Sequence, residues 1–493
     1  MEAGLGAGLL TKGLPRGSPA AYDHRVSPDP AAEATELLQK LIRFDTVNPP
    51  GNERAAQEYL SAYLTEAGFE CELLGAEPER PNLVARLRPA DHTATGPTLC
   101  YLSHVDTVLA NAEEWSAHGP WSGELSDGFV WGRGALDMKS QTAAEIAAAA
   151  GLARSGWRPK EGELLIVTVV DEETGGELGA QWICKEHPEK VRCDLLVNEG
   201  GGAVFEYGGP PARRHYGVCC AEKGVFRFTV TTDGVAGHAS MPKIGENALL
   251  KMAPVLERLA ARQPAYELTA EPEAFLRALG EDPGDPAGAV AKLGAADERL
   301  VTMFEPMLGV TFTPTRIRAS EKINVIPSSA VLKVDCRVPP GLGEEEVLRG
   351  IDEVLGESPG DDNGIGADED TGAGAGGVAQ GVDVKPPWRI DFTERIEGNR
   401  SPISSPLMEA IADWVAEHDA GADVVPVILP GFTDSRHFRE AFPDCVAYGF
   451  FPQKHQTLFE AAPLIHAADE RIDARDLAFA TEFFRDLALR VLD

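Results

Sequence analysis

Residues 163–173 read ELLIVTVVDEE, a continuous apolar run that ends in three acids. Three further runs share this character, NLVARL at 82–87, TLCYLSHVD at 98–106 and CDLLVNEG at 193–200, and the helix-forming stretch QTAAEIAAAAGLARSG lies at 141–156. Short apolar runs without alternation are typical of strands that are covered on both faces. Their alternation with helices predicts an α/β fold with a mixed, mostly parallel sheet flanked by helices.

Further helices are predicted on either side of these strands. Helical apolar spacing begins near Ala32 in ATELLQKLIRF and returns in AAQEYLSAYLTEAGF, where Gly68 is placed to cap the C-terminus. The last part of the chain contains SPLMEAIADWVAEH, VVPVILPGFTDSRHF and DLAFATEFFRDLALRVL, which resume the alternation of strand and helix. Residues 1–30 are rich in Gly, Pro and Ala without periodicity and are predicted to be a disordered tail.

The middle of the chain changes character near Tyr216. GVCCAEKGVFRFTVTTDG and AVLKVDCRVPPG alternate like half-exposed strands, and ENALLKMAPVLERLAARQ between them is helical. We therefore predict a catalytic domain of residues 31–216 and 398–493, interrupted by an α+β lid or dimerisation domain at 217–397. Residues 356–382 combine Gly with acids, which indicates a mobile loop or, alternatively, a substrate lid.

The composition excludes some classes of partner. The 493 residues exceed the size of one ordinary domain, and a hydrophobic content of 43% supplies side chains for two cores. A formal net charge of −33 repels phosphate backbones and anionic membrane surfaces. Neither nucleic acid nor a membrane is therefore an expected partner, and the acidity itself is interpreted as a solvated surface.

Cysteine usage and the N-terminus indicate a cellular compartment. Eight cysteines occur without a CxxC pair, and Cys219 and Cys220 are adjacent, a spacing that disfavours a disulfide between them, so reduced thiols are expected. The N-terminus lacks a charged start followed by a sustained apolar stretch, and no uncharged apolar run approaches the roughly 18 residues that span a bilayer. These features predict a cytoplasmic protein.

Polar side chains that could bind metal follow the predicted strands. Strands of an α/β sheet carry functional side chains at their carboxyl ends. His104 and Asp106 end one strand and point to the same side of an extended chain, so the carboxylate can orient the imidazole. Taken alone, an HxD pair is a weak signal for metal.

Clustered carboxylates strengthen the metal hypothesis. Asp171, Glu172 and Glu173 follow the next strand, where three acids repel one another unless cations compensate them. Glu199 ends another apolar strand in the same way. These positions favour a metal site over solvated surface charge.

Two further residues complete a ligand set. Asp137 precedes the helix at 141–156, where an isolated Asp more often serves as an N-cap, and IHAADE supplies His466. Two zinc ions in one site need a shared carboxylate as well as terminal ligands for each. Two His and three carboxylates match that need, with one acid left for proton transfer.

The order of these motifs resembles that of one known family. SHVDTV, GRGALDMKS, DEETGG, NEGG, GHAS, NVIP, DCRVPPG, TDSRHF and IHAADE occur in the order found in the di-zinc metallopeptidases. This family includes aminoacylase, acetylornithine deacetylase, succinyl-diaminopimelate desuccinylase, glutamate carboxypeptidase and carnosinase-like dipeptidases. The resemblance covers roughly residues 32–493 and implies a zinc-peptidase-like catalytic domain.

The resemblance implies a role for each candidate ligand. His104, Asp137 and Glu199 are implied to hold one zinc, and Asp137, Glu173 and His466 the other, so that Asp137 bridges the two ions. The implied cofactor is therefore two Zn²⁺ per chain, for which Co²⁺ or Mn²⁺ could substitute.

The resemblance also implies how the reaction proceeds. Glu172 is implied to be the general base, which accepts a proton from the attacking water and returns it to the leaving nitrogen. Asp106 is implied to orient His104, and the peptide bond between Asp137 and Met138 is implied to be cis.

Four further residues are candidates for contact with substrate, and two of them, His238 and Asn324, match family positions. His238 and Asn324 are implied to donate to the oxyanion, and His238 does so from the neighbouring subunit in dimeric relatives, which implies a homodimer through the inserted domain. Arg436 is the expected partner of a free substrate carboxylate. Arg337 is the weaker candidate, because it could instead pair with the acids at 344–346.

The predicted activity is hydrolysis of an amide or peptide bond in a small peptide or N-acyl amino acid with a free carboxylate. A dipeptidase or carboxypeptidase is favoured, and an N-acyl-amino-acid deacylase is the alternative. A catalytically silent binding or assembly protein is the alternative outside the enzymes, and the absence of GxSxG disfavours a serine hydrolase. Four other histidines do not end apolar strands beside an acid and are expected not to bind metal: His118, His215, His437 and His455.

Overall fold

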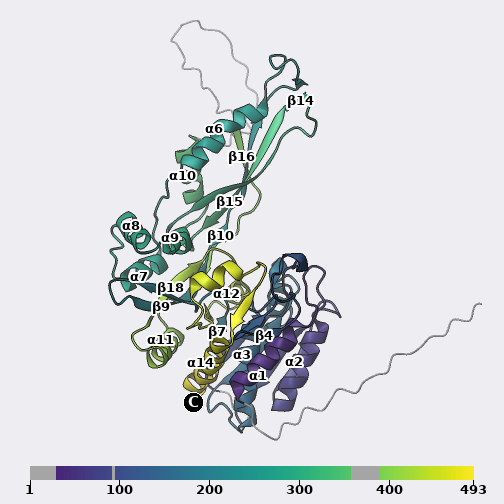
Figure 1. The fold of residues 1–493 in the computed structure, drawn as a ribbon, viewed down its shortest axis with the longest axis vertical. Helices are drawn as coiled ribbons and strands as arrows, with labels where there is room; N and C mark the ends of the chain where they lie inside the picture. The colour runs from purple at the N-terminus through teal and green to yellow at the C-terminus, as the bar shows by residue number, and fades with distance from the viewer. Residues whose placement is uncertain (1–28, 91–94, 357–387) are drawn as a thin grey trace, which may run out of the picture.

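The computed structural model describes residues 29–90, 95–356 and 388–493. The predicted tail at 1–30 and the predicted loop at 356–382 lie almost wholly outside the described residues. Figure 1 shows an elongated molecule with a large sheet at one end and a second, narrower lobe at the other. None of the helices in the described ranges has the length and apolarity needed to cross a membrane.

The large sheet has ten strands, and its central members are parallel. They are β1 (Glu70–Leu74), β2 (Asn82–Leu87), β3 (Thr98–His104), β6 (Glu163–Val169), β7 (Leu195–Asn198), β8 (Val204–Tyr207), β9 (Arg213–Glu222), β17 (Asn399–Arg400), β18 (Asp423–Leu429) and β19 (Val446–Gly449). The order is β1-β2-β6-β3-β7-β19-β9-β17, with β8 and β18 also paired to β9. β3 runs parallel to both β6 and β7, whereas β1 and β2 are antiparallel. The predicted mixed sheet is confirmed.

Strand β6 shows why these runs lack alternation. Every residue of β6 is buried. Leu164 and Ile166 point into the core on one face, and Leu165 and Val167 point into the core on the other. A strand covered on both faces needs apolar side chains at every position.

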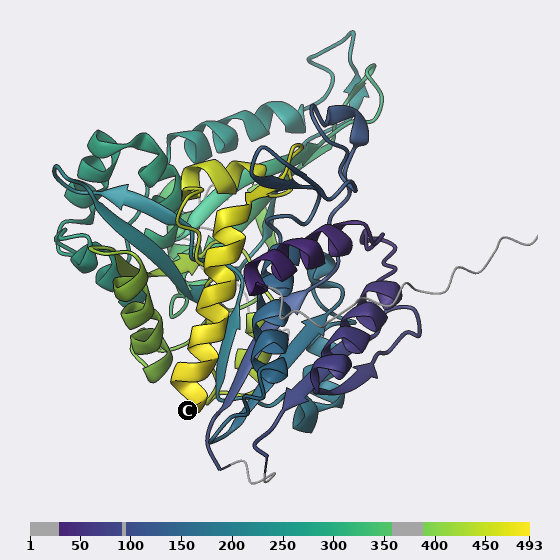
Figure 2. The ribbon, with the colours of Figure 1, turned by 60° about the horizontal axis from the view of Figure 1, so that its bottom comes forward.

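Helices cover both faces of the large sheet. One face is covered by α1 (Pro30–Ile42), α3 (Lys139–Arg154), α11 (Pro406–His418) and α14 (Ala474–Leu492), and the other by α4 (Ala180–Glu186), α5 (Pro188–Val191) and α12 (Ser435–Ala441). Figure 2 shows α14 (yellow) between α11 (yellow-green) and α1 (purple), both of which it contacts. The alanines of α3 are buried against the sheet and allow close packing with α1 and α14.

This lobe also contains the helix α2 and several short or peripheral elements. They are α2 (Arg54–Ala67), α13 (Leu458–Ala461), the 3-10 turns η1 (Ala112–Glu114), η2 (Glu172–Thr174) and η4 (Ala462–Leu464), and a three-stranded sheet of β4 (Glu124–Ser126), β5 (Phe129–Trp131) and β20 (Arg471–Asp473). Gly68 caps α2 with a φ of 102°, as predicted from the sequence. All eight cysteines are free thiols, as expected.

The second lobe is built on an antiparallel sheet. Its strands are β10 (Gly224–Val225), β11 (Phe228–Asp233), β13 (Thr311–Arg318), β15 (Ser329–Val338) and β16 (Trp388–Phe392), and α6 (Ala248–Ala261) and α10 (Glu344–Leu355) pack on it. Phe228 and Val230 alternate into this core, as half-exposed strands should. At the far end of the lobe, β12 (Gly237–His238) pairs with β14 (Val325–Ile326) (Figure 1).

The second sheet does not begin at residue 217, where the sequence predicts that the inserted domain starts. β9 crosses that position and lies wholly in the large sheet, so the second sheet starts at β10. A helical segment of α7 (Ala270–Ala278), α8 (Pro286–Ala296), α9 (Glu298–Phe304) and η3 (Glu305–Leu308) also packs on β8, β9 and β18 of the large sheet. The assignment of residues 217–397 as one lid or dimerisation domain stays a prediction.

Candidate active site

The parallel strands bring four of the predicted side chains to one edge of the sheet. His104 is the last residue of β3, and Glu199 directly follows β7. Glu172 and Glu173 lie in the turn η2 that follows β6. Because β3 is parallel to both neighbours, their carboxyl ends meet at the same edge. Asp137 and His466 reach this edge from loops.

The first group of contacts surrounds His104. Its Nε2 atom lies 3.2 Å from Oδ1 of Asp137 and 3.6 Å from Oε1 of Glu199. Oε2 of Glu172 is 4.0 Å away from the same nitrogen. Two ligand atoms that share a tetrahedral cation at about 2.0–2.1 Å stand about 3.3 Å apart, so this spacing fits a metal ion.

The second group of contacts surrounds His466. Its Nε2 atom lies 3.1 Å from Oδ2 of Asp137 and 3.2 Å from Oε2 of Glu173. The two carboxylate oxygens of Asp137 therefore face different histidines. This is the arrangement expected of a carboxylate shared by two cations.

The electrostatics of the cluster favour cations. Burial, followed by the charge of Glu199, raises the pKa of Glu172 well above its usual range, and burial with the charge of Asp137 does the same for Glu199. The carboxylate of Asp137, which accepts a hydrogen bond from the His466 ring, raises the pKa of His466 to about 10. No Lys or Arg within the described ranges forms an ion pair with these carboxylates, so divalent ions are the fitting compensation.

The loop that carries Asp137 is held by a buried acid. Glu470 accepts hydrogen bonds from the backbone N–H groups of Leu136 (2.8 Å) and Asp137 (3.1 Å) and pairs with Arg133 at 2.5 Å. The peptide bond between Asp137 and Met138 is cis, as the resemblance implied. The N-cap alternative for Asp137 is wrong, because Met138 caps α3 and no side-chain cap bond forms.

Asp106 lies behind His104 and also holds the turn that carries the acids. The Nδ1 atom of His104 is 3.1 Å from the carbonyl oxygen of Asp106 and 3.5 Å from its carboxylate. Asp106 also accepts from the backbone N–H groups of Glu172 (3.3 Å) and Glu173 (3.2 Å). Asn48 donates to the Asp106 carboxylate at 2.9 Å. This geometry fits the predicted orienting role.

The third acid of the DEE run, Asp171, points away from the cluster. Its carboxylate pairs with Arg80 at 3.1 Å and accepts from Asn48 at 3.2 Å. It takes a φ of 72°, so the chain turns sharply between the strand and η2. The charge of Asp171 is thus compensated by Arg80, and only Glu172 and Glu173 face the histidines.

A cavity of about 360 Å³ opens beside the candidate ligands. Asp137, Glu172, Glu173, Glu199 and His466 line it. The rest of its wall is largely apolar and includes Phe205, Met303, Phe304, Val427, Ile428, Leu429, Phe432, Leu458 and Ile465. A concave site of this size with a few convergent polar groups is typical of small-molecule binding.

The two arginines predicted to bind a substrate carboxylate lie just outside the cavity wall. Arg436 stacks on the ring of Phe432 at 4.5 Å and pairs with Glu440 at 3.0 Å, while its buried Nε atom has no hydrogen-bond partner. Arg337 lies 5.8 Å from the same ring and pairs with Asp335 at 2.7 Å. Arg436 therefore keeps a free donor, whereas Arg337 is held by an acid of its own strand and not by those at 344–346.

His238 and Asn324 are remote from the cluster in this chain. His238 lies in β12, which pairs with β14 at the tip of the second lobe (Figure 1). The carbonyl of Asn324 accepts a hydrogen bond from the backbone N–H of Ala239 at 3.0 Å. The structure thus places the two residues together but does not bring them to the ligands of the same chain.

Comparison with known proteins identifies the family. Residues 100–490 match the model of peptidase family M20/M25/M40. The chain belongs to this family. The family resemblance inferred from the ordered motifs is thereby confirmed.

Curated relatives of this M20 chain include succinyl-diaminopimelate desuccinylases. The protein from Wolbachia pipientis wMel is 29% identical over 233 residues, which make up 46% of this chain and 54% of the relative. The protein from Cereibacter sphaeroides strain ATCC 17023 is 26% identical over 341 residues, 67% of this chain and 84% of the relative. The chain thus spans about half the length of the Wolbachia protein.

Solved structures share the M20 fold over most of their length. A metallo-carboxypeptidase from Sulfolobus solfataricus has a TM-score of 0.64 at 16% identity, with 93% of this chain and 99% of that chain covered. Human carnosine dipeptidase 1 gives 0.64 at 15%, with 94% and 96% covered. A dinuclear metal binding peptidase from Bacillus subtilis gives 0.56 at 13%, with 94% and 98% covered. These likenesses show the fold.

Three residues around the candidate active site were not singled out from the sequence. Glu470 and Asp434 lie inside the quoted motifs IHAADE and TDSRHF, and Asn48 lies in VNPPG. Burial raises the pKa of Asp434 to about 8, and its charge contributes to the raised pKa of Glu172. Glu470 and Asp434 could have been found from the sequence, because each is an acid inside a motif that already contributes a candidate residue.

The four histidines expected not to bind metal lie outside the cluster. His118 packs against Trp131 with ring centroids 5.1 Å apart, His215 pairs with Asp423, and His437 faces the carbonyl of Gly175 at 3.3 Å. His455 lines a separate cavity.

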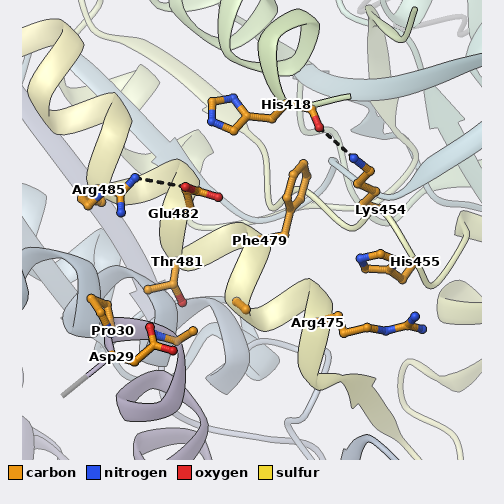
Figure 3. A pocket seen from close by; sticks show the side chains of 12 residues that line it. Asp29, Pro30, His418, Lys454, His455, Arg475, Phe479, Thr481, Glu482 and Arg485 are labelled. Carbon is orange, nitrogen blue, oxygen red and sulfur yellow. Dashed lines mark hydrogen bonds and ion pairs between the residues drawn. The ribbon is translucent and has the colours of Figure 1, made fainter. Parts of the chain in front are cut away.

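This second cavity, of about 480 Å³, lies between α1, α11 and α14. Figure 3 shows the imidazole of His418 above the carboxylate of Glu482, which with Asp486 forms a further group of potential metal ligands. Arg485 already pairs with Glu482 at 3.2 Å and Asp486 at 2.7 Å. Because a cation of the chain compensates these acids, we assign no metal site there.

Proposed function

We propose that the chain is a metal-dependent hydrolase that cleaves an amide bond in a small peptide or N-acyl amino acid. The observation that carries the proposal is Asp137, whose two oxygens face His104 at 3.2 Å and His466 at 3.1 Å beside one cavity. Glu199 and Glu173 complete the two donor sets. His nitrogen with carboxylate oxygen is a donor set that suits zinc.

The residues present fit two Zn²⁺ ions, with Co²⁺ or Mn²⁺ as substitutes. His104, Asp137 and Glu199 would hold one ion, and Asp137, Glu173 and His466 the other. When bound, such ions polarise the amide carbonyl and acidify water. The Bacillus subtilis neighbour is a dinuclear metal binding peptidase, which supports the stoichiometry.

Glu172 is the proposed general base. It lies in the turn after β6 and lines the cavity, and its Oε2 atom is 4.0 Å from His104. A carboxylate in this position can take a proton from the attacking water and pass it to the leaving nitrogen. Asp106 keeps His104 in the tautomer that presents Nε2 to the site.

The proposed substrate has a free carboxylate next to the scissile bond. Arg436 is the proposed partner, since its guanidinium lies on Phe432 of the cavity wall. Arg337 is the second choice because Asp335 holds it. Dipeptidase or carboxypeptidase activity is the leading form, and the named desuccinylase relatives favour an N-acyl-amino-acid deacylase as the alternative.

We also propose a homodimer through the second lobe. Exposed apolar side chains gather around β12 and β14, including those of Val235, Met241, Ile244 and Ile323. A partner that covers this surface would remove it from water. In that assembly His238 and Asn324 of the partner would supply the donors to the oxyanion that the site of one chain lacks.

The test is turnover of a substrate panel by zinc-loaded protein. Dipeptides and N-acyl amino acids are assayed side by side, with chelator-treated protein as the reference. Turnover that is lost with the metal and restored by Zn²⁺ supports the hydrolase. Full turnover after chelation, with metal loss shown by elemental analysis, refutes it, and absence of turnover across the panel by loaded protein favours a silent binding protein.

A further inference from the structure

The wall of the candidate active-site cavity is of two kinds. One part carries the candidate metal ligands and Glu172. The other part is apolar and includes Phe205, Met303, Phe304, Leu429, Phe432 and Ile465. An apolar wall beside reactive polar groups selects the part of a substrate that does not react.

Two apolar side chains of this wall are left exposed. Met303 has 37% and Ile465 has 43% of its surface exposed, although both line a concave cavity. Ile465 directly precedes His466, so the exposed apolar surface adjoins a candidate ligand. Water in contact with this surface is displaced favourably by an apolar group of a substrate.

The wall around Phe304 is rigidly packed. Phe304 is buried, with its ring centroid 4.8 Å from that of Phe205 and 4.7 Å from that of Phe275. It ends α9, part of the helical segment from α7 to η3 that packs on the large sheet. A wall that is packed before binding costs little to order when a ligand enters.

Charge argues against a second carboxylate in this region. Among the described residues that line the cavity, none is Lys or Arg, while five are Asp, Glu or His of the candidate centre. A carboxylate placed against the apolar wall would be desolvated without a partner. A substrate group that reaches this wall is therefore favoured when it is neutral.

We propose that the substrate carries a bulky, uncharged aliphatic or aromatic group that packs against Met303, Phe304 and Ile465. The inference rests on the proposed hydrolase function and names its substrate class. Either half of the amide supplies the same chemistry, as an apolar side chain on the amino acid or as an apolar acyl group. Substrates with a short or acidic group in that place are the disfavoured class.

The experiment compares zinc-loaded wild type on four substrates, N-acetyl-L-phenylalanine, N-acetylglycine, N-octanoylglycine and N-succinylglycine. We expect kcat/KM at least about tenfold higher for one of the two apolar substrates than for N-acetylglycine and N-succinylglycine. The apolar substrate with the higher kcat/KM shows whether the amino acid or the acyl group packs against the wall. Met303→Ser is expected to remove most of this gain, so that the two apolar substrates fall toward the kcat/KM of N-acetylglycine.

A control variant and a binding measurement keep the two proposals separate. Leu348→Ser changes a similarly exposed apolar residue on α10 and is expected to keep the wild-type preference. Calorimetry of wild type is expected to show tighter binding of L-phenylalanine or octanoate than of glycine or succinate. If no amide is cleaved but this binding preference holds, the hydrolase proposal fails and the apolar site stands. Equal or better turnover of N-succinylglycine, or a preference that Met303→Ser leaves intact, overturns the inference.

Discussion

The Nε2 atom of His466 lies 3.1 Å from Oδ2 of Asp137. The other oxygen of the same carboxylate faces His104 at 3.2 Å. Two histidines from opposite ends of the chain thus share one acid at the carboxyl edge of the large sheet. This geometry carries the proposal of a two-ion centre.

Replacing Glu172 by Gln should separate catalysis from metal binding. The amide keeps the size of the side chain but cannot accept the proton, so we expect kcat to fall by roughly 10²–10⁴. The metal content should stay at the wild-type value, because the proposed donor sets do not include Glu172. Glu177→Gln, an exposed acid in the same segment, is the matched control. A metal-loaded Gln variant with wild-type kcat would remove Glu172 from its role.

Replacing Asn48 by Leu should weaken the centre without touching a proposed ligand. Asn48 donates to Asp106 at 2.9 Å and to Asp171 at 3.2 Å. Its loss therefore removes a hydrogen bond from Asp106, which orients His104, and one from Asp171, which starts the η2 turn. Loss of such a supporting contact typically lowers metal affinity by about 10–100-fold. Competition with a zinc-sensitive dye measures the change, and Asn111→Leu at an exposed turn serves as the control. Unchanged affinity would show that the network is not needed.

Mixing two inactive variants should test the shared site of a dimer. His238→Ala removes the proposed donor to the partner, and Glu172→Gln removes the base of its own chain. A mixed dimer then contains one complete site and one inactive site. When equal amounts exchange at random, half of the dimers are mixed, so about a quarter of all sites are complete and activity returns to about a quarter of the wild-type value. Activity that stays at the level of the separate variants, with mixed dimers shown by mass spectrometry, would contradict the exchange of His238.

The sequence predicted best the features that a local pattern of residues determines. β2 and β6 are buried at every position, and their apolar runs predicted this directly. The ends of parallel strands converge, so His104, Glu172 and Glu199 could be expected at one edge from the sequence alone. Asp137 and His466 follow no such strand. They were added because two ions need a shared carboxylate and further terminal ligands, and the family resemblance then implied the role of each.

Features that depend on distant partners were not predictable in this way. The helices at 270–308 are amphipathic, but nothing local shows that they pack on β9 and β18 and not on the second sheet. Asp171 was grouped with Glu172 and Glu173 because the three are adjacent, whereas Arg80, 91 positions earlier, decides its orientation. Buried supports such as Glu470 become visible only when the backbone groups that they satisfy are known.

The stability of the protein should depend on pH through Lys223. This buried side chain donates to the carbonyls of Pro306 (2.7 Å) and Gly309 (2.8 Å), and burial lowers its pKa to about 7. Between pH 7 and its unfolded pKa the unfolded chain binds the proton and the folded chain does not, so this group makes the folded state more stable as pH rises. Below pH 7 the contribution is constant.

Chemical denaturation of wild type and Lys223→Met at pH 7 and pH 9 measures this effect. The difference in unfolding free energy between the two proteins should shift in favour of wild type by roughly 2–3 kcal/mol over that range. Lys251→Met, at a partly exposed position near the N-terminus of α6, should show no such shift. A constant difference between wild type and Lys223→Met would mean that Lys223 keeps its proton in the fold.

Metal stoichiometry tests the central claim most directly. Wild type and Asp137→Asn are loaded with Zn²⁺, passed through gel filtration and measured by elemental analysis, with Asp127→Asn at an exposed turn as the control. We predict two zinc ions per chain for wild type and the control, and fewer than one for Asp137→Asn, because both donor sets lose the carboxylate between His104 and His466. A wild type that binds no zinc, or an Asn variant that retains two ions, would contradict the account.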